Sequence, residues 1–270
     1  MKKILFTDLD GTLLNDNKEV DGKNLDAISR LIASGHKFVI STGRPIQSAV
    51  KISEKYGWMG KGFYISSYNG GLIYDCFNHS SIVRYPIKKE YVRYIMDQAY
   101  KKGFHAHTYD SVYVVSEREN EDLKYYSDAI KVDYVVVPDI MEYLKEDPIK
   151  VIVMCRESRE RLMDFENSVK LYCDGKLATV FSSPVLLEFS NPMATKGLAV
   201  RHFCEHFNIP ISCCVAVGDE ENDISMITEA GTGIAMCNGT QTTKAAADYI
   251  TENDNNSCGI CEVIERFILN

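Results

Sequence analysis

The sequence predicts an α/β fold whose core is a parallel sheet, with an α+β domain inserted into that core. Up to Ser67, strand and helix patterns alternate, which is typical of a parallel sheet with helices on its faces. Around Pro86 the order changes to adjacent strand candidates mixed with helices, and from Thr195 the earlier alternation returns. We therefore expect a core of residues 1–85 and 191–270, and an inserted domain of residues 86–190.

The first part of the core begins with an apolar strand that ends at Thr7. Apolar residues at helical spacing then predict a helix over 21–34, which Gly35 ends. A buried strand follows from Lys37, and Pro45 stands where the next helix can begin. The remaining expected elements are a helix over 46–56, a strand over 63–67 and a hairpin of strands 72–74 and 82–85.

The inserted segment and the rest of the core are predicted in the same way from apolar periodicity. In the inserted segment we expect helices over 88–102, 117–130 and 158–172, and strands over 104–108, 112–115, 132–137, 149–155, 177–182 and 185–189. After it we expect a helix over 195–207 capped by Thr195, a strand over 213–219, a helix over 222–229, a strand over 232–236, a helix over 241–247, a strand over 249–250 and a terminal helix.

Composition limits the classes of protein to consider. A net charge of -8 argues against a main role in nucleic-acid binding, because such binding depends on clustered Lys and Arg. No apolar run is long enough to span a bilayer and Met1 to Phe6 is too short for a signal peptide, so we expect a cytoplasmic protein without a membrane partner. In that compartment the nine cysteines are expected to be reduced thiols, Cys258 and Cys261 included. Nothing in the sequence calls for an obligate protein partner.

Two carboxylates one residue apart follow the first strand. Asp8 and Asp10 would crowd each other on one face unless the chain leaves strand geometry or a cation neutralises them. Mg2+ takes carboxylate and carbonyl oxygens and leaves water positions for phosphate oxygens. This stretch alone is also compatible with an ordinary aspartate-glycine turn.

Further polar groups are predicted at the same edge of the sheet, because the carboxyl ends of parallel strands form one edge where ligands bind. They are Thr42 with Gly43, Lys196 at a helix start, and the run Gly218–Asp223. Carboxylates, one lysine, hydroxyl groups and helix N-termini together suit phosphoryl transfer, which needs a metal and donors to charged oxygens.

These four motifs, Asp8–Thr12, Thr42–Arg44, Lys196–Gly197 and Gly218–Asp223, resemble the signature motifs of the haloacid dehalogenase-like superfamily, in its Cof-type phosphatase branch with a class IIB cap. The similarity covers nearly all of the chain. It implies a Rossmann-like core with an inserted α/β cap, Mg2+ as cofactor, and hydrolysis of a small phosphorylated metabolite, such as a sugar phosphate.

The resemblance also implies a role for each motif residue. Asp8 would be the nucleophile that becomes an aspartyl phosphate, and Asp10 the general acid and base. The phosphate-binding residues would be Leu9, Thr42, Gly43, Lys196 and Asn222, with Arg44 and Asn69 as substrate contacts. The metal would be held by Asp8, Asp10 through its backbone carbonyl, Asp219 and Asp223, the last directly or through another ligand.

Three alternatives stay open. The same site could serve a phosphomutase, which returns the phosphoryl group to a sugar, or a metal-dependent phosphate-binding module without catalysis, in which Asp10 has no obvious task. The stretch from His202 to His206 fits the His-x-x-Glu-His pattern of zinc proteases. Because apolar residues of that helix form its buried stripe, we expect both histidines beside the stripe at the surface.

Overall fold

The computed structural model describes residues 2–270, which divide by their contacts into two compact units. Unit 1 contains the chain up to Gly43, Ala49–Val83 and Ala194–Asn270, and unit 2 contains Arg44–Ser48 and Arg84–Met193. Within the described residues, none of the helices has the length and apolar character needed to cross a bilayer.

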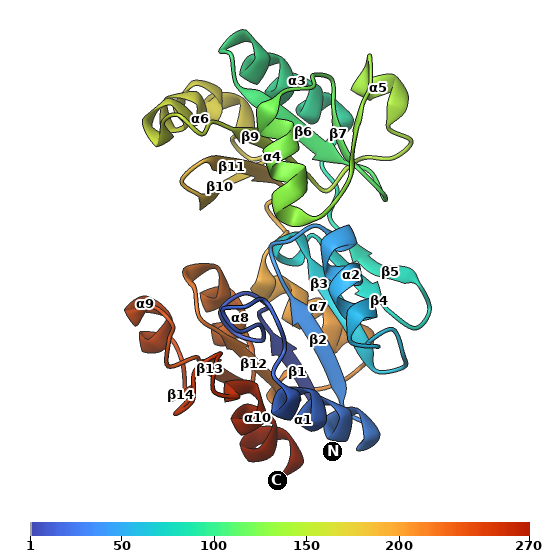
Figure 1. Cartoon of the computed structure of the whole chain (residues 1–270), viewed down its shortest axis with the longest axis vertical. Coiled ribbons are helices and arrows are strands. Elements are labelled where there is room, and N and C mark those ends of the chain that lie inside the picture. Colours follow the sequence, from blue (N-terminus) through green and yellow to red (C-terminus); the bar gives the residue numbers. More distant parts are fainter. Residues whose placement is uncertain (1) are drawn as a thin grey trace. The chain divides into compact units, whose positions relative to one another are not determined.

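Unit 1 is built on an eight-stranded sheet in the order β14-β13-β12-β1-β2-β3-β4-β5 (Figure 1). All neighbours from β14 to β3 are parallel, and β4 is antiparallel to β3. The strands are β1 (Ile4–Thr7), β2 (Lys37–Ser41), β3 (Phe63–Ser67), β4 (Leu72–Asp75), β5 (Ser80–Arg84), β12 (Cys214–Gly218), β13 (Thr232–Ala235) and β14 (Tyr249–Ile250). The parallel-sheet core predicted from the sequence is confirmed.

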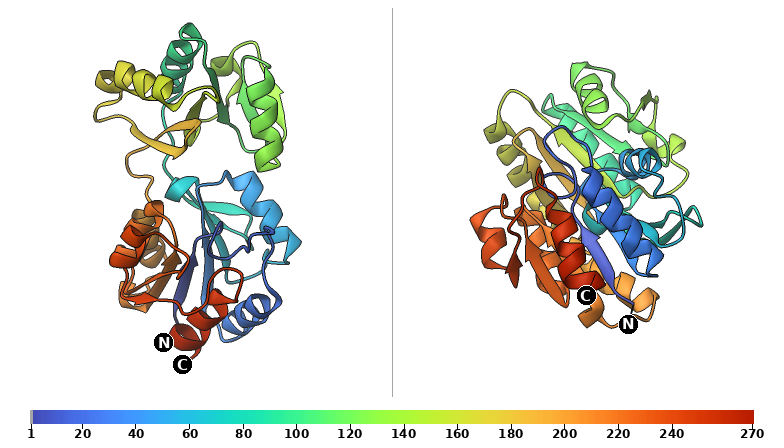
Figure 2. Two further views of the ribbon diagram at one scale, coloured as in Figure 1. Left: turned by 60° about the vertical axis from the view of Figure 1, so that its left-hand side comes forward. Right: turned by 60° about the horizontal axis from the view of Figure 1, so that its bottom comes forward.

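Helices cover both faces of this sheet (Figures 1 and 2). On one face α7 (Lys196–His206) packs on β1, where the rings of Phe6 and Phe203 meet edge to face at 5.4 Å. On the other face α1 (Gly22–Ala33) contacts β2 and the C-terminal helical segment. The helix α2 (Ile46–Lys55) begins in the short segment grouped with unit 2 and continues in unit 1. The remaining helices of unit 1 are α8 (Ile224–Glu229), α9 (Gln241–Ala245) and α10 (Gly259–Val263), with single turns η1 (Tyr68–Gly70), η2 (Ile211–Cys213) and η3 (Glu221–Asp223) and a π-helical end η4 (Ile264–Leu269).

Two helix caps place elements of unit 1 that matter for the site. The Thr195 hydroxyl accepts a hydrogen bond from the Leu198 N–H at 3.1 Å, which confirms the predicted cap of α7. The Asp21 carboxylate caps α1 by accepting from the Lys23 N–H at 2.8 Å. Both caps satisfy backbone donors that a helix start otherwise leaves unpaired.

Unit 2 contains a six-stranded sheet in the order β10-β11-β9-β6-β7-β8. Its strands are β6 (His105–Tyr109), β7 (Val114–Ser116), β8 (Tyr134–Val136), β9 (Lys150–Met154), β10 (Ala178–Ser183) and β11 (Leu186–Ser190), and its helices are α3 (Lys89–Lys101), α4 (Glu121–Ile130), α5 (Ile140–Tyr143) and α6 (Arg159–Cys173). Neighbours are antiparallel except β7 and β8, which are parallel. The exception follows from α4, because a helix between two strands returns the chain to the same end of the sheet.

The two faces of the unit 2 sheet differ in chemistry. One face packs on α3 and α6. Its apolar side chains include Val151 and Val153 of β9, which belong to the same buried cluster as Phe165 of α6. The strand register places Lys150 and Glu188 on the opposite face, where the Lys150 ammonium lies 2.8 Å from the Glu188 carboxylate and both side chains are buried. Removal of one partner from a buried ion pair destabilises the protein, because the remaining charge has neither its partner nor its hydration.

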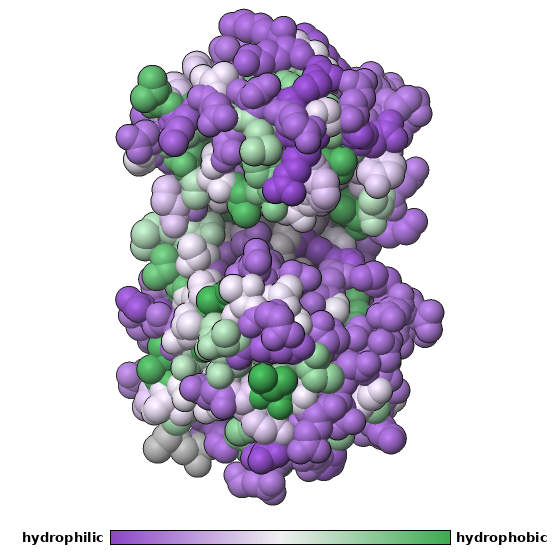
Figure 3. Space-filling model, turned by 90° about the vertical axis from the view of Figure 1, so that its left-hand side faces the viewer, coloured by the Kyte–Doolittle hydropathy of each residue, from purple (hydrophilic) through white to green (hydrophobic). Residues whose placement is uncertain are grey.

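The surface of each unit is mixed in polarity. On the face drawn in Figure 3, apolar side chains are scattered among polar ones over both units. Leu171 and Phe77 are among the exposed apolar side chains, at 94% and 55% exposure. Scattered apolar residues of this kind are ordinary on protein surfaces and indicate no binding site by themselves.

The buried pair gives a stability prediction for unit 2. Glu188→Gln keeps the shape of the side chain but removes the negative charge 2.8 Å from the buried Lys150 ammonium, so we expect a loss of about 3–5 kcal/mol in the free energy of unfolding. The double variant Lys150→Met/Glu188→Leu removes both charges and should be more stable than the single variant. Urea unfolding followed by circular dichroism measures both, and a single variant as stable as the wild type would contradict this account.

Candidate active site

Three buried carboxylates meet at the carboxyl edge of the unit 1 sheet. Asp8 follows β1 and Asp219 follows β12, and these strands are parallel neighbours joined by the Asp8 N–H, which donates to the Val217 carbonyl at 2.9 Å. Asp223 ends the turn η3 that follows Asp219. Carboxylate oxygens of Asp8, Asp219 and Asp223 all lie within 4.8 Å of one another. Among residues 2–270 this is the only group of three or more His, Cys, Asp or Glu side chains placed to hold a metal ion.

Lys196, the first residue of α7, places its ammonium between two of these carboxylates. Its Nζ lies 2.5 Å from Asp8 Oδ1 and 2.5 Å from Asp223 Oδ1, and only 1% of the residue is exposed. Charge-assisted hydrogen bonds of this kind are the strong ones in a protein interior. Lys196 therefore joins α7 to the ends of β1 and β12.

The charges of this cluster do not balance. Burial would lower the pKa of Lys196, but the carboxylates of Asp8 and Asp223 raise it above its ordinary value, which keeps the ammonium charged. Burial also raises the pKa of Asp8, against the opposing effect of Lys196 and with support from the charge on Asp223. Three carboxyl groups share one buried cation, and the raised pKa of Asp8 means that the group resists a third negative charge unless a further cation is present. The surplus negative charge and the all-oxygen donor set fit a divalent cation such as Mg2+.

Asp219 and Asp223 are fixed by the surrounding backbone. Asp223 Oδ2 accepts from the N–H groups of Asp219 and Glu220, at 3.0 Å each, which orients the carboxylate that meets Lys196. The Thr12 hydroxyl donates to Asp219 Oδ1 at 2.6 Å. A Cβ on Gly218 would lie 2.4 Å from the Asp223 side chain, so this turn closes only around glycine.

The main chain after Asp8 leaves strand geometry at once. Gly11 has a φ of 81°, and a Cβ there would lie 2.4 Å from Asp219 Oδ2. The Leu14 N–H donates to the Leu9 carbonyl at 2.8 Å, and Asp10 forms a bridge with Leu14. The Asp10 carboxylate accepts from Lys18 Nζ at 2.9 Å and is partly exposed. Asp10 thus lies beside the three-carboxylate group, and its side chain is not a member of it.

The residues predicted to bind phosphate or substrate lie in several places. Asn69 connects two of the motifs, because its N–H donates to the Thr42 carbonyl at 3.0 Å and its Oδ1 accepts from Asn222 Nδ2 at 3.3 Å. Gly43 lies against the same amide, since a Cβ there would be 3.1 Å from Asn69 Oδ1. Leu9 is fully buried. Arg44 directly follows Gly43 but groups with unit 2.

The turn that carries Asn69 lies close to the start of α7, where Lys196 is located. A Cβ on Gly70 would lie 2.3 Å from the Thr195 carbonyl, so the turn that carries Asn69 packs directly against the start of α7. At Gly197, the residue after Lys196, a Cβ would lie 2.4 Å from the Ser225 carbonyl of α8. The structure therefore brings together residues from all four sequence motifs in unit 1.

The histidines of the protease-like pattern are not part of any such group in the part of the chain that the structure describes. His202 and His206 are both partly exposed on α7, and the His206 ring packs on Phe207 at 4.7 Å. All nine cysteines are free thiols, and Cys258 donates to Asp21 Oδ1 at 3.0 Å rather than bonding Cys261.

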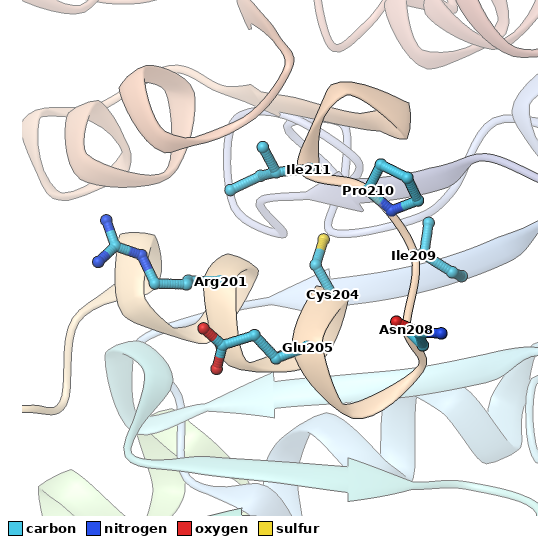
Figure 4. Close-up of a pocket in the computed structure, with 7 residues that line it drawn as sticks. All are labelled: Arg201, Cys204, Glu205, Asn208, Ile209, Pro210 and Ile211. Carbon is cyan, nitrogen blue, oxygen red and sulfur yellow. The ribbon is translucent and has the colours of Figure 1, made fainter.

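A pocket of about 340 Å³ lies at the opposite end of α7 from Lys196. Figure 4 shows its lining, in which the Cys204 side chain points toward Ile211 and Pro210 and the Glu205 carboxylate lies on the side of Arg201. None of the predicted site residues lines it. Arg201 forms two hydrogen bonds of 2.9 Å with Glu229. The pocket therefore lies at the C-terminal part of α7, among residues that are separate from the carboxylate site.

Two residues that touch the site have no role predicted from the sequence. Thr12 belongs to the first motif, and its hydroxyl at the carboxyl edge is the signal that could have identified it. Asn238 donates from Nδ2 to the Gly11 carbonyl at 2.8 Å. It follows β13, so the rule that polar residues gather after parallel strands applies to it as well.

The Thr12 contact gives a prediction about pH. Burial raises the pKa of Asp219 to about 6, and the hydrogen bond from Thr12 opposes this rise. Thr12→Val keeps the shape and removes the donor, so the pKa of Asp219 should rise further and protons should compete with Mg2+ up to a higher pH. We expect Mg2+ affinity at pH 6–7 to fall by about tenfold or more, with recovery at higher pH. Calorimetric Mg2+ titrations across this range test it, and an unchanged pH dependence would contradict the assigned role of Thr12.

Comparison with known proteins agrees with this geometry. The family model described as haloacid dehalogenase-like hydrolase matches residues 5–264. The putative phosphatase YxeH of Bacillus subtilis is 29% identical over 100% of this chain and 99% of its own length. The 5-amino-6-(5-phospho-D-ribitylamino)uracil phosphatase YcsE of the same organism is 27% identical over 99% of this chain and 96% of its own. A crystal structure from Thermotoga maritima, 31% identical, superimposes with a TM-score of 0.88 over 98% of this chain and 97% of that one. The chain belongs to the haloacid dehalogenase-like hydrolase family, as a phosphatase of its Cof-type branch.

Proposed function

We propose that this protein is a Mg2+-dependent phosphatase that hydrolyses small phosphorylated metabolites, sugar or polyol phosphates among them, through an aspartyl-phosphate intermediate. The observation that carries the proposal is the buried group of Asp8, Asp219 and Asp223 with a single ammonium, that of Lys196, between two of them. In such a group the carboxylate at the end of β1 can act as a nucleophile. The group has less positive than negative charge, and a cation that also binds the phosphate would balance it.

Asp8 is the proposed nucleophile. One carboxylate oxygen of Asp8 forms a bond to phosphorus while the bond from phosphorus to the alcohol oxygen breaks. Lys196, 2.5 Å from Asp8 Oδ1, compensates the negative charge that otherwise repels a carboxylate from a phosphate dianion. A bound Mg2+, held by Asp8, Asp219, the Asp10 carbonyl and Asp223 directly or through another ligand, would supply further positive charge as a Lewis acid.

Asp10 is the proposed general acid and base. In the first step its carboxyl group gives a proton to the leaving alkoxide. In the second step its carboxylate takes a proton from a water molecule, which attacks the phosphorus of the aspartyl phosphate and releases Asp8 and inorganic phosphate. The side chain is partly exposed and paired with Lys18, so it must turn from that exposed lysine toward the substrate.

The proposed phosphate contacts lie close to these groups. Thr42, Gly43 and Leu9 would hold the non-bridging oxygens, and Asn222 would add a donor. Asn69, which links Thr42 to Asn222, and Arg44, which begins the short segment of unit 2, are proposed to contact the substrate beyond its phosphate. Unit 2, our proposed cap, would select the group esterified to phosphate, because the reacting groups of unit 1 concern the phosphoryl group alone.

The substrate class and the compartment are proposed on separate grounds. YcsE, the B. subtilis relative, is named for a substrate in which phosphate is carried by a ribityl chain, which supports a phosphorylated polyol or sugar for this chain too. Nine free cysteines support a reducing compartment, and we propose the cytoplasm. The partners we propose are such small metabolites, and neither nucleic acid nor membrane.

A panel of phosphate esters assayed with and without Mg2+ tests the proposed reaction. We expect hydrolysis of sugar and polyol phosphates that EDTA abolishes and Mg2+ restores. Asp8→Asn keeps the shape but removes the nucleophile, so its turnover should fall by about 10^4-fold or more, as is typical when a covalent nucleophile is lost. Near wild-type turnover by Asp8→Asn with Mg2+ present would exclude the covalent mechanism.

Leaving-group chemistry separates Asp10 from Asp8. Asp10→Asn cannot protonate an alkoxide, so a sugar phosphate should react very slowly, whereas p-nitrophenyl phosphate needs no such proton and should still phosphorylate Asp8. The second step should stall, because the variant cannot activate water. Rapid-quench measurements should show a burst of up to about one nitrophenolate per site followed by slow turnover. Equal slowing of both substrates without a burst would mean that Asp10→Asn disturbs the metal site or the fold, and would remove the support for an acid-base role of Asp10.

A further inference from the structure

The loop after Asp8 is held from outside by two asparagines near the C-terminal end of the chain. Asn238 lies in the turn after β13, and Asn255 lies after β14. Both side chains donate to main-chain carbonyls of the loop, Asn238 to Gly11 and Asn255 to Leu14. All of these residues belong to unit 1.

Asn238 joins the loop to the strand end that carries Asp219. Its Nδ2 donates to the Gly11 carbonyl at 2.8 Å, one residue after Asp10. In the same turn the Thr240 N–H donates to the Asp219 carbonyl at 2.9 Å. The turn after β13 therefore bonds to the main chain on both sides of the carboxylate group.

Asn255 supports the far side of the loop and also supports Asn238. It is 4% exposed, and its Nδ2 donates to the Leu14 carbonyl at 3.1 Å and to Asp16 Oδ1 at 3.2 Å. Its N–H donates to Asn238 Oδ1 at 3.3 Å. Leu14 is the bridge partner of Asp10, so one amide holds the residue after Asp10 and the other holds the segment that is bridged to it.

Asp10 needs this support more than Asp8 does. The Asp8 main chain is anchored by its bond to Val217 in the neighbouring strand, and its side chain is anchored by Lys196. Asp10 lies outside the strands, and its carboxylate accepts from the exposed Lys18. The next residue, Gly11, has no side chain to restrict its main chain.

We propose that Asn238 and Asn255 are positioning residues for the acid-base steps of Asp10, which hold the next residue, Gly11, and the bridged residue Leu14; this inference rests on the proposed function. Neither residue is placed on the substrate. Loss of either amide donor should let the chain around Gly11 turn, so that the Asp10 carboxyl group spends less time where the leaving oxygen or the water needs it. Steps that do not use Asp10 should be little affected.

The test uses Asn238→Asp and Asn255→Asp, which keep the side-chain shape and the acceptor oxygen but lose the Nδ2 donor. Asn238→Ala and Asn255→Ala repeat the test without an added charge. The matched control is Asn208→Asp, which adds the same charge at an exposed position of unit 1 just after the C-terminal end of α7, away from the loop. Circular dichroism melting checks that each full-length variant folds.

Two measurements then distinguish positioning from a merely structural role. Hydrogen exchange should speed up by about tenfold in residues 9–16 of the Asn238 and Asn255 variants, as expected when one supporting hydrogen bond is lost, and not in the control. With p-nitrophenyl phosphate and Mg2+, the rate of the nitrophenolate burst should stay within about twofold of wild type while steady-state turnover falls by about tenfold, because only dephosphorylation then needs Asp10. Turnover of a sugar phosphate should fall by at least as much.

The inference is overturned if the Asn238 and Asn255 variants match Asn208→Asp in turnover, or if burst rate and turnover fall together, which would place the effect on Asp8 or on the fold. A wild type that hydrolyses no phosphate ester overturns the proposed function, and this catalytic role with it, whatever the exchange rates are. A wild type that is active beside variants without selective loss overturns only the positioning role.

Discussion

The Lys196 ammonium lies 2.5 Å from carboxylate oxygens of both Asp8 and Asp223, and hardly any of it reaches water. A buried charge destabilises a protein unless it is paired. Removing the lysine or one of the two aspartates would therefore leave an uncompensated charge in the interior and lower the free energy of unfolding. Asp219 adds a third carboxylate to this group without a second lysine. The region is thus held together by ion pairs and is yet short of positive charge, and the proposed metal-dependent phosphoryl transfer requires both properties.

The positions of β1, β12 and α7 in unit 1 are those that bring Asp8, Asp219 and Lys196 together. β1 and β12 must be parallel neighbours for Asp8 and Asp219 to leave the sheet at one edge, and the register that pairs Thr7 with Val217 does this. The start of α7 must reach the same edge, and the Thr195 cap fixes the residue at which the helix, and so Lys196, begins. Capping, register and the charge group therefore support one another.

Much of unit 1 and its motifs could be predicted from the sequence, because apolar periodicity and strand-end chemistry are local signals. The parallel pairing of β7 with β8 and the four-residue helix α5 could not, since the first depends on a crossover and the second is shorter than a periodic pattern. The contact between Thr12 and Asp219 spans 207 positions, and that between Asn238 and Gly11 spans 227. No local pattern encodes such partners. The placement of Asp10 against Lys18 depends likewise on loop geometry at Gly11 and Lys18, both with positive φ.

The close backbone contacts at Gly197 and Gly218 have a consequence for inheritance. At Gly197 the Ser225 carbonyl, and at Gly218 the Asp223 side chain, occupy the place of a Cβ atom. Every amino-acid replacement of glycine adds that atom, so every missense mutation in these two codons must push apart elements that carry Lys196, Asp219 or Asp223. Neighbouring positions on the outer face of α7, such as Arg201, carry no such restriction. Selection on a population of such genes would thus act strictly on two residues that have no functional group at all.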